Sequence, residues 1–166
     1  MAVVEPTVVY PEGRFQEAVA AAIEDTLTAA GRRFLVLQRF GLDIAVFMAN
    51  QPQNVIRLFE VKSYNEQRPG GVGFGNRRGQ GAQVDLLLCL DASLPLLDGM
   101  IRWVYADATL PPGSPRYALF TCAKAKAAAM GGVARGKQNN LRTSALRDCL
   151  VAWNQLCEEL HSFLLT

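Results

Sequence analysis

The segment from residue 41 to residue 64 constrains the fold of this chain more than any other. It contains two runs rich in Val, Ile, Leu and Phe, which predict β-strands, separated by turn-forming Asn, Gln and Pro residues. Side chains alternate across a strand, so Glu60 and Lys62 in the second run share one face. An acid and an amine are costly to place in an apolar strand unless they have a role. The segment therefore predicts a hairpin with one charged face.

The same hairpin would bring Asp43, in the first run, beside Glu60 and Lys62. Two carboxylates and a lysine at one edge of a sheet are suited to a divalent cation, because such cations prefer oxygen ligands. In the alternative interpretation, Lys62 neutralises Glu60 on an exposed face of the sheet, and Asp43 is a surface charge near the turn.

Hydrophobic patterns elsewhere predict helices and strands around this hairpin. Helical spacing of apolar residues predicts a helix from residue 11 to about residue 30, ended by Gly31. A last helix is expected from residue 141 to about residue 165, capped by Asn139 or Asn140. A short helix is expected at 123–130, and strands are expected at 32–40, 43–49, 55–63, 100–106 and 116–122.

Length and composition are those of one domain with a hydrophobic core. The chain has 166 residues, of which 50% are hydrophobic, and a formal net charge of +2. This small charge neither requires nor excludes a nucleic acid partner. The four cysteines lack metal-binding spacing and are expected to be reduced thiols. With no signal peptide and no hydrophobic run near the ~20 residues of a membrane span, we expect a cytoplasmic protein without a membrane partner.

Asp43 followed by Glu60-Val61-Lys62 resembles the PD-(D/E)XK signature of restriction endonucleases, Holliday-junction resolvases and related nucleases. The predicted element order resembles that family from about residue 11 to residue 122, although Leu42 stands where the signature has proline. The resemblance implies an α/β fold with a restriction-endonuclease-like three-layer core. In that core a central mixed sheet of about five strands is flanked by helices. A single domain would span residues 1–166, with C-terminal helices at 123–166.

The resemblance also implies a metal-dependent nuclease that hydrolyses phosphodiester bonds of DNA. Mg²⁺ or Mn²⁺ would be held by Asp43, Glu60 and the backbone carbonyl of Val61. Lys62 would assist the attacking water and stabilise the negative charge that develops.

Many members of the family carry a metal-binding glutamate on the first helix. Glu17 corresponds best by its distance from Gly31, whereas the helical phase favours Glu12 or Gln16. We take Glu17 as the candidate catalytic residue and Glu12 as its alternative. A solvated helix face is the structural alternative for Glu17.

A second helix of the family would lie at residues 80–91, where the apolar run at 86–90 is compatible with either a buried strand or a buried helix. A glutamine near its start is an active-site residue in some branches, so Gln83 is a further candidate catalytic residue. Exposed polarity at a helix start is the alternative for Gln83.

Two basic segments are candidates for contacts with a DNA backbone. The first is the glycine-rich stretch 65–81, predicted to be a loop near the site, and the second follows residue 123. The candidate nucleic-acid-binding residues are Arg77, Arg78, Lys124, Lys126, Arg135 and Lys137. No nucleotide cofactor is expected, because the dinucleotide fingerprint is absent and Gln138 interrupts a P-loop-like run.

DNA is the expected partner, and the apolar face of the last helix allows a homodimer. The alternative function is that of a catalytically inactive nuclease-fold protein that binds nucleic acid or a protein partner through the basic segments and the last helix. An enzyme acting on a small metabolite, with residues 65–81 as a lid, is a third hypothesis.

Overall fold

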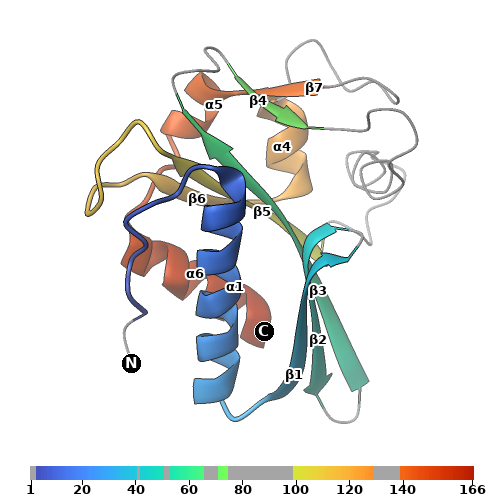
Figure 1. Cartoon of the computed structure of the whole chain (residues 1–166). Helices are drawn as coiled ribbons and strands as arrows, with labels where there is room; N and C mark the ends of the chain where they lie inside the picture. Colours follow the sequence, from blue (N-terminus) through green and yellow to red (C-terminus); the bar gives the residue numbers. More distant parts are fainter. Residues whose placement is uncertain (1–2, 41, 51–52, 66–70, 75–98, 129–138) are drawn as a thin grey trace.

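The computed structural model describes residues 3–40, 42–50, 53–65, 71–74, 99–128 and 139–166 (Figure 1). Its helices and strands are α1 (Glu12–Ala29), β1 (Arg33–Phe40), β2 (Leu42–Asn50), β3 (Gln53–Tyr64), β4 (Gly71–Phe74), β5 (Ile101–Asp107), β6 (Tyr117–Phe120), α4 (Cys122–Ala128), β7 (Asn139–Arg142), α5 (Thr143–Arg147) and α6 (Trp153–Leu165).

The main sheet has five strands in the order β1-β2-β3-β5-β6. Strands β3 and β5 are parallel, and the other neighbouring pairs are antiparallel. The predicted α/β class with a mixed sheet of about five strands flanked by helices is therefore confirmed. The parallel pair places the end of β3 next to the end of β5, in the centre of the sheet.

Helices cover the two faces of this sheet, and each face has its own hydrophobic cluster. On one face, α1 and α6 pack through residues such as Phe15, Ile23 and Leu160 onto Phe59 and Val61 of β3. On the other face, α4 and α5 pack onto β5 and β6, with Trp103 and Phe120 among the residues of that cluster. Alternation along β3 thus directs its odd-numbered apolar residues toward α1 and α6.

The predicted helix near the N-terminus and the five predicted strands are confirmed to within a few residues at their ends. The short helix predicted at 123–130 corresponds to α4. Because these elements carry strong local periodicity, their existence could be recognised without knowledge of the tertiary structure.

The single helix predicted from residue 141 to residue 165 is wrong. The segment divides into the end of β7, α5 and α6, and Asn139 and Asn140 belong to β7 rather than to a helix cap. The break contains neither Gly nor Pro. It forms because Val151 pairs with Tyr117 of β6, with N···O distances of 2.7 and 3.0 Å. A tertiary pairing has therefore overridden the helical pattern.

The prediction of a loop over residues 65–81 is corrected in part, because β4 lies within it. This strand pairs with β7 in a separate two-stranded sheet, from Gly71↔Arg142 to Phe74↔Asn139. The helix predicted at 80–91 falls outside the described residues. Among the described helices, none combines the length and the apolar character needed to cross a membrane.

Candidate active site

The β2–β3 hairpin brings Asp43 to the charged end of β3, as predicted. Residue pairs of the ladder run from Asn50↔Gln53 to Ile44↔Phe59. Beyond the last pair, the Asp43 carboxylate replaces a backbone partner: its Oδ2 accepts a hydrogen bond of 2.7 Å from the N–H of Val61. The carboxylate is thereby held beside Glu60 and Val61, two of the residues expected to hold a cation.

Glu60 and Lys62 form an ion pair with an Nζ–Oε1 distance of 2.9 Å. Both residues are buried, with exposed fractions of 6% and 5%. They lie on the face of β3 that carries Tyr64, opposite Phe59 and Val61, and their partners in the parallel ladder are Trp103 and Tyr105. The pair therefore forms, but it does not lie on an exposed sheet face as the ion-pair alternative assumed.

Burial sets the electrostatics of this pair. It raises the pKa of Glu60 to about 8, against the lowering effect of Lys62, and the nearby Asp43 and Glu12 carboxylates raise this pKa further. Burial alone would lower the pKa of Lys62, but Glu60, Glu12 and Asp43 outweigh it and raise the pKa above its ordinary value. Among the described residues, three carboxylates thus lie around one ammonium group, and of these carboxylates Glu60 is buried and Asp43 and Glu12 are half-buried.

Helix α1 contributes Glu12 and Gln16 to this region. Glu12 is the first residue of the helix, and its Oε2 accepts a hydrogen bond of 3.4 Å from the N–H of Ser63. One turn later, Gln16 donates through Nε2 to the carbonyl oxygen of Asp43 at 3.1 Å and to Oε1 of Gln38 at 3.2 Å. Both residues therefore support the end of the hairpin that carries Asp43.

The structure places the side chain of Glu17 on the exposed face of α1, whereas Glu12, its alternative, lies at Ser63. The neighbour of Glu17, Gln16, is 6% exposed and belongs to the buried face of α1. Consecutive residues of a helix point about 100° apart, so the two cannot face the sheet together. The helical phase was a better guide than the distance from Gly31.

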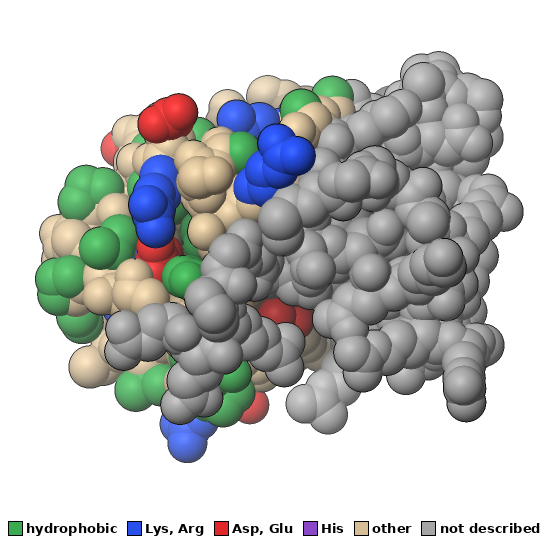
Figure 2. All heavy atoms as spheres, turned by 90° about the horizontal axis from the view of Figure 1, so that it is seen from above, with side chains coloured by type: hydrophobic (Ala, Val, Ile, Leu, Met, Phe, Trp, Pro, Cys, Tyr) green, Lys and Arg blue, Asp and Glu red, His purple; other side chains and the backbone are tan. Residues whose placement is uncertain are grey.

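The other sequence candidates are only partly covered by the described residues. Lys124 is half-buried on α4, with its backbone N–H bonded to Thr121 Oγ1 at 3.2 Å, and Lys126 lies in the same helix. Gln83, Arg77, Arg78, Arg135 and Lys137 lie outside the described residues. Figure 2 shows the face above the start of α1, where the described basic and acidic side chains are interspersed with uncharged ones.

Sequence reasoning missed Ser63, which touches two other segments. Besides its N–H bond to Glu12, its hydroxyl donates to the carbonyl oxygen of Val9. Ser63 lies on the same face of β3 as Phe59 and Val61 and is 7% exposed. A polar residue at an apolar position of the alternating pattern was the signal that could have identified it.

The donor atoms suit a hard cation, since carboxylates and a backbone carbonyl are oxygen ligands of the kind that Mg²⁺ and Mn²⁺ prefer. Across the part of the chain that the structure describes, no three His, Cys, Asp or Glu residues are arranged closely enough to hold a metal ion by themselves. The expected set includes only two such side chains, Asp43 and Glu60, together with the Val61 carbonyl.

Comparison with protein-family models gives no match for this chain. No curated protein is significantly similar to it. A function for this chain must therefore be inferred from the geometry of the site.

Proposed function

We propose that this protein is a nuclease that uses Mg²⁺ or Mn²⁺ to hydrolyse phosphodiester bonds of DNA at the end of β3. The observation that carries the proposal is the buried Glu60–Lys62 pair with the Asp43 carboxylate held against Val61 beside it. Among the described residues, carboxylates outnumber cationic groups around this pair, and a divalent cation would reduce the repulsion between them.

Asp43, Glu60 and the carbonyl oxygen of Val61 would hold the cation, and Glu12 would add negative charge from beside these ligands. When bound, the cation would polarise the scissile phosphate and lower the pKa of a bound water. The Val61 N–H bond orients one oxygen of Asp43, which leaves the other oxygen available as a ligand.

Lys62 would act as a charged donor and not as a base. The surrounding carboxylates raise its pKa, so it keeps its proton at neutral pH. An ammonium group next to the attacking water can orient that water and stabilise the charge that develops on the phosphate oxygens. This role agrees with its ion pair to Glu60, which holds the Lys62 Nζ at the cation site.

The assignment of DNA as substrate follows from the resemblance of Asp43 and Glu60-Val61-Lys62 to the nuclease signature. Contacts with the DNA backbone through the basic segments, including Lys124 and Lys126, belong to the same proposal, as does a homodimer. The wild-type protein is therefore expected to cleave plasmid DNA with Mg²⁺ or Mn²⁺ and to lose this activity in the presence of a chelator.

The variant Lys62→Met tests the mechanism. We expect cleavage to fall by about a hundredfold or more, because a preorganised charge at the reacting phosphate is lost. DNA binding, measured by fluorescence anisotropy, should stay close to that of the wild type. Glu24→Gln, which neutralises an exposed carboxylate on α1, is the control and should cleave like the wild type.

Cation-dependent cleavage by Lys62→Met at the wild-type rate would contradict the role of Lys62. A wild-type protein that binds DNA without cutting plasmid, linear or single-stranded substrates would overturn the proposal and favour the inactive nuclease-fold alternative.

A further inference from the structure

The segment 3–10 that precedes α1 is bonded to the rest of the protein at both of its ends. At the outer end, Trp153 Nε1 of α6 donates to the carbonyl oxygen of Val3 at 2.9 Å. At the inner end, the Ser63 hydroxyl of β3 donates to the carbonyl oxygen of Val9. Figure 1 shows this segment passing α6 on its way to the start of α1. Through these two bonds the segment connects α6 to β3.

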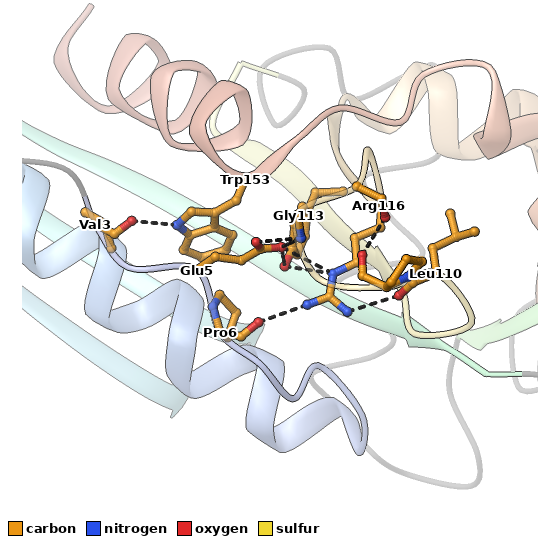
Figure 3. A network of polar contacts seen from close by, with 10 residues as sticks. Val3, Glu5, Pro6, Leu110, Gly113, Arg116 and Trp153 are labelled. Carbon is orange, nitrogen blue, oxygen red and sulfur yellow. Dashed lines mark hydrogen bonds and ion pairs between the residues drawn. The ribbon is translucent and has the colours of Figure 1, made fainter.

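Between these ends, Glu5 forms a latch with the turn before β6 and with β6 itself (Figure 3). Its carboxylate accepts hydrogen bonds from Gly113 N–H at 2.9 Å and from the Tyr117 hydroxyl at 2.8 Å. It also pairs with Arg116 Nε at 3.5 Å, and Arg116 Nη2 donates to the carbonyl oxygen of Pro6 at 2.9 Å. We call these contacts the Glu5 latch.

The contacts of the Glu5 latch are important for stability, because the Arg116 side chain in it is only 2% exposed. A buried guanidinium requires a negative partner and acceptors for its N–H groups. Glu5 supplies the charge, while Pro6 supplies one of the acceptors from the same segment. Loss of Glu5 would leave the buried Arg116 guanidinium without its negative partner and would weaken the attachment of residues 3–10 to the turn before β6.

The inner end of the segment meets the candidate active site. Ser63, next to Lys62, holds the Val9 carbonyl through its hydroxyl and the Glu12 carboxylate through its N–H. The N-cap residue of α1, Pro11, makes no side-chain cap bond among the described residues. The start of α1 is positioned by the contacts of the preceding segment and of β3 together with the packing of Phe15 and the bonds of Gln16, so a shift of that segment would disturb the position of Glu12.

We propose that residues 3–10 are a positioning element of the cation site, in which the Glu5 latch keeps Glu12 at Ser63, where its negative charge acts on Glu60, Lys62 and the cation. This inference rests on the proposed function, because it concerns the same site. Glu5 and Arg116 do not touch that site, so they are positioning residues and not catalytic ones.

A double-mutant cycle tests the proposal through the affinity for Mn²⁺, measured by titration calorimetry, and through the cation concentration that gives half-maximal cleavage. Glu12→Gln should weaken both about tenfold or more, and Glu5→Ala should weaken them several-fold, up to about tenfold. Cleavage by Glu5→Ala at saturating cation should be close to wild type. Glu5→Ala should add little in the Glu12→Gln background, because both changes act through one carboxylate.

A general loss of packing would instead weaken cation binding equally in both backgrounds. Val4→Ala is the matched control in the same segment, since Val4 is 87% exposed. Glu5→Gln keeps acceptors for Gly113 and Tyr117 and should lie between the wild type and Glu5→Ala. If Glu5→Ala does not fold, Glu5→Gln carries the same cycle.

Unchanged cation affinity in Glu5→Ala, or a full additive effect in the Glu12→Gln background, would overturn the positioning role while the nuclease proposal stands. A wild-type protein that binds no Mn²⁺ would overturn the proposed function and this inference with it. The two failures are therefore distinguishable in one set of titrations.

Discussion

The described residues contain two ion pairs with at least one buried partner, and the surroundings of the two pairs differ. Arg116 pairs with Glu5, and its guanidinium also donates to the Tyr117 hydroxyl and to the carbonyl oxygens of Pro6 and Leu110. Glu60 and Lys62 form a shorter pair, but Asp43 and Glu12 add two more carboxylates around it. The first pair is balanced in charge and joined by neutral hydrogen-bonding groups, whereas the second is not balanced.

The difference agrees with a structural role for the Arg116–Glu5 pair and with the cation-binding role proposed for the site at Glu60 and Lys62. Burial raises the pKa of Tyr117, and its hydrogen bond to Glu5 raises it too, so that this phenol remains a neutral donor in the latch. Around Glu60, burial and the neighbouring carboxylates act in the same direction and raise the pKa to about 8. An excess of carboxylates over cationic groups, as found here among the described residues, is the property expected of a cation-binding site.

The largest effect on stability is expected when the balanced pair is broken. Arg116→Met should lower the free energy of unfolding by about 3–5 kcal/mol, because the buried bonds to Glu5, Pro6 and Leu110 are lost together. Lys62→Met should cost less, since burial already favours the protonated, uncharged form of Glu60 and no unpaired buried charge is left. Urea denaturation at neutral pH without divalent cations measures both. Equal losses in the two variants would contradict the distinction between the pairs.

A smaller effect of opposite sign is expected when the unbalanced pair is neutralised. Glu60→Gln combined with Lys62→Met should raise the free energy of unfolding by about 1–4 kcal/mol, since uncharged groups of similar size remove the desolvation cost of the ions. The same double variant should have no cation-dependent cleavage. Thermal denaturation compares it with Glu5→Gln combined with Arg116→Met, which should be destabilised. Destabilisation of the Glu60/Lys62 double variant would show that its ion pair serves stability.

The smallest expected effect is the change in the free energy of unfolding per pH unit that is due to the titration of Glu60. The pKa is raised from 4.5 to about 8, so the folded state keeps a proton that the unfolded state releases. This contribution is complete below the unfolded pKa and is lost as the pH rises toward 8, by at most about 1.4 kcal/mol per pH unit for one proton. The difference in unfolding free energy between wild type and Glu60→Gln measures it.

Mg²⁺ provides the matching control for this pH dependence. Cation binding requires the ionised carboxylate, so added Mg²⁺ should stabilise the wild type more at about pH 8 than at about pH 5. Glu60→Gln should show little of this difference. Stabilisation by Mg²⁺ that is independent of pH would place the cation away from Glu60.

Much of the candidate site could be predicted from the sequence because it depends on one local element. A hairpin register of Ile44↔Phe59 follows from two strands and a short turn, and it brings Asp43 to Val61. Glu60 and Lys62 share a face because side chains alternate along any strand. The choice between Glu12 and Glu17 was harder, since it depends on how α1 docks onto the sheet.

Other features had no local signal. The break between α5 and α6 comes from the pairing of Val151 with Tyr117, and the sequence there contains no helix-breaking residue. Strand β4 exists through its pairing with β7, far along the chain. The Glu5 latch joins residues separated by more than a hundred positions. Such contacts depend on which surfaces meet after the chain has folded.

The strands of the main sheet, the hairpin and the set of charged groups that the hairpin presents could be read from the sequence alone, because neighbouring side chains encode periodicity and alternation. Packing of distant elements was needed to bury the Glu60–Lys62 pair and to bring Glu12 and Val9 to Ser63 beside it. The physical reason is that burial and charge balance depend on the elements packed around a group, and these come from distant parts of the chain.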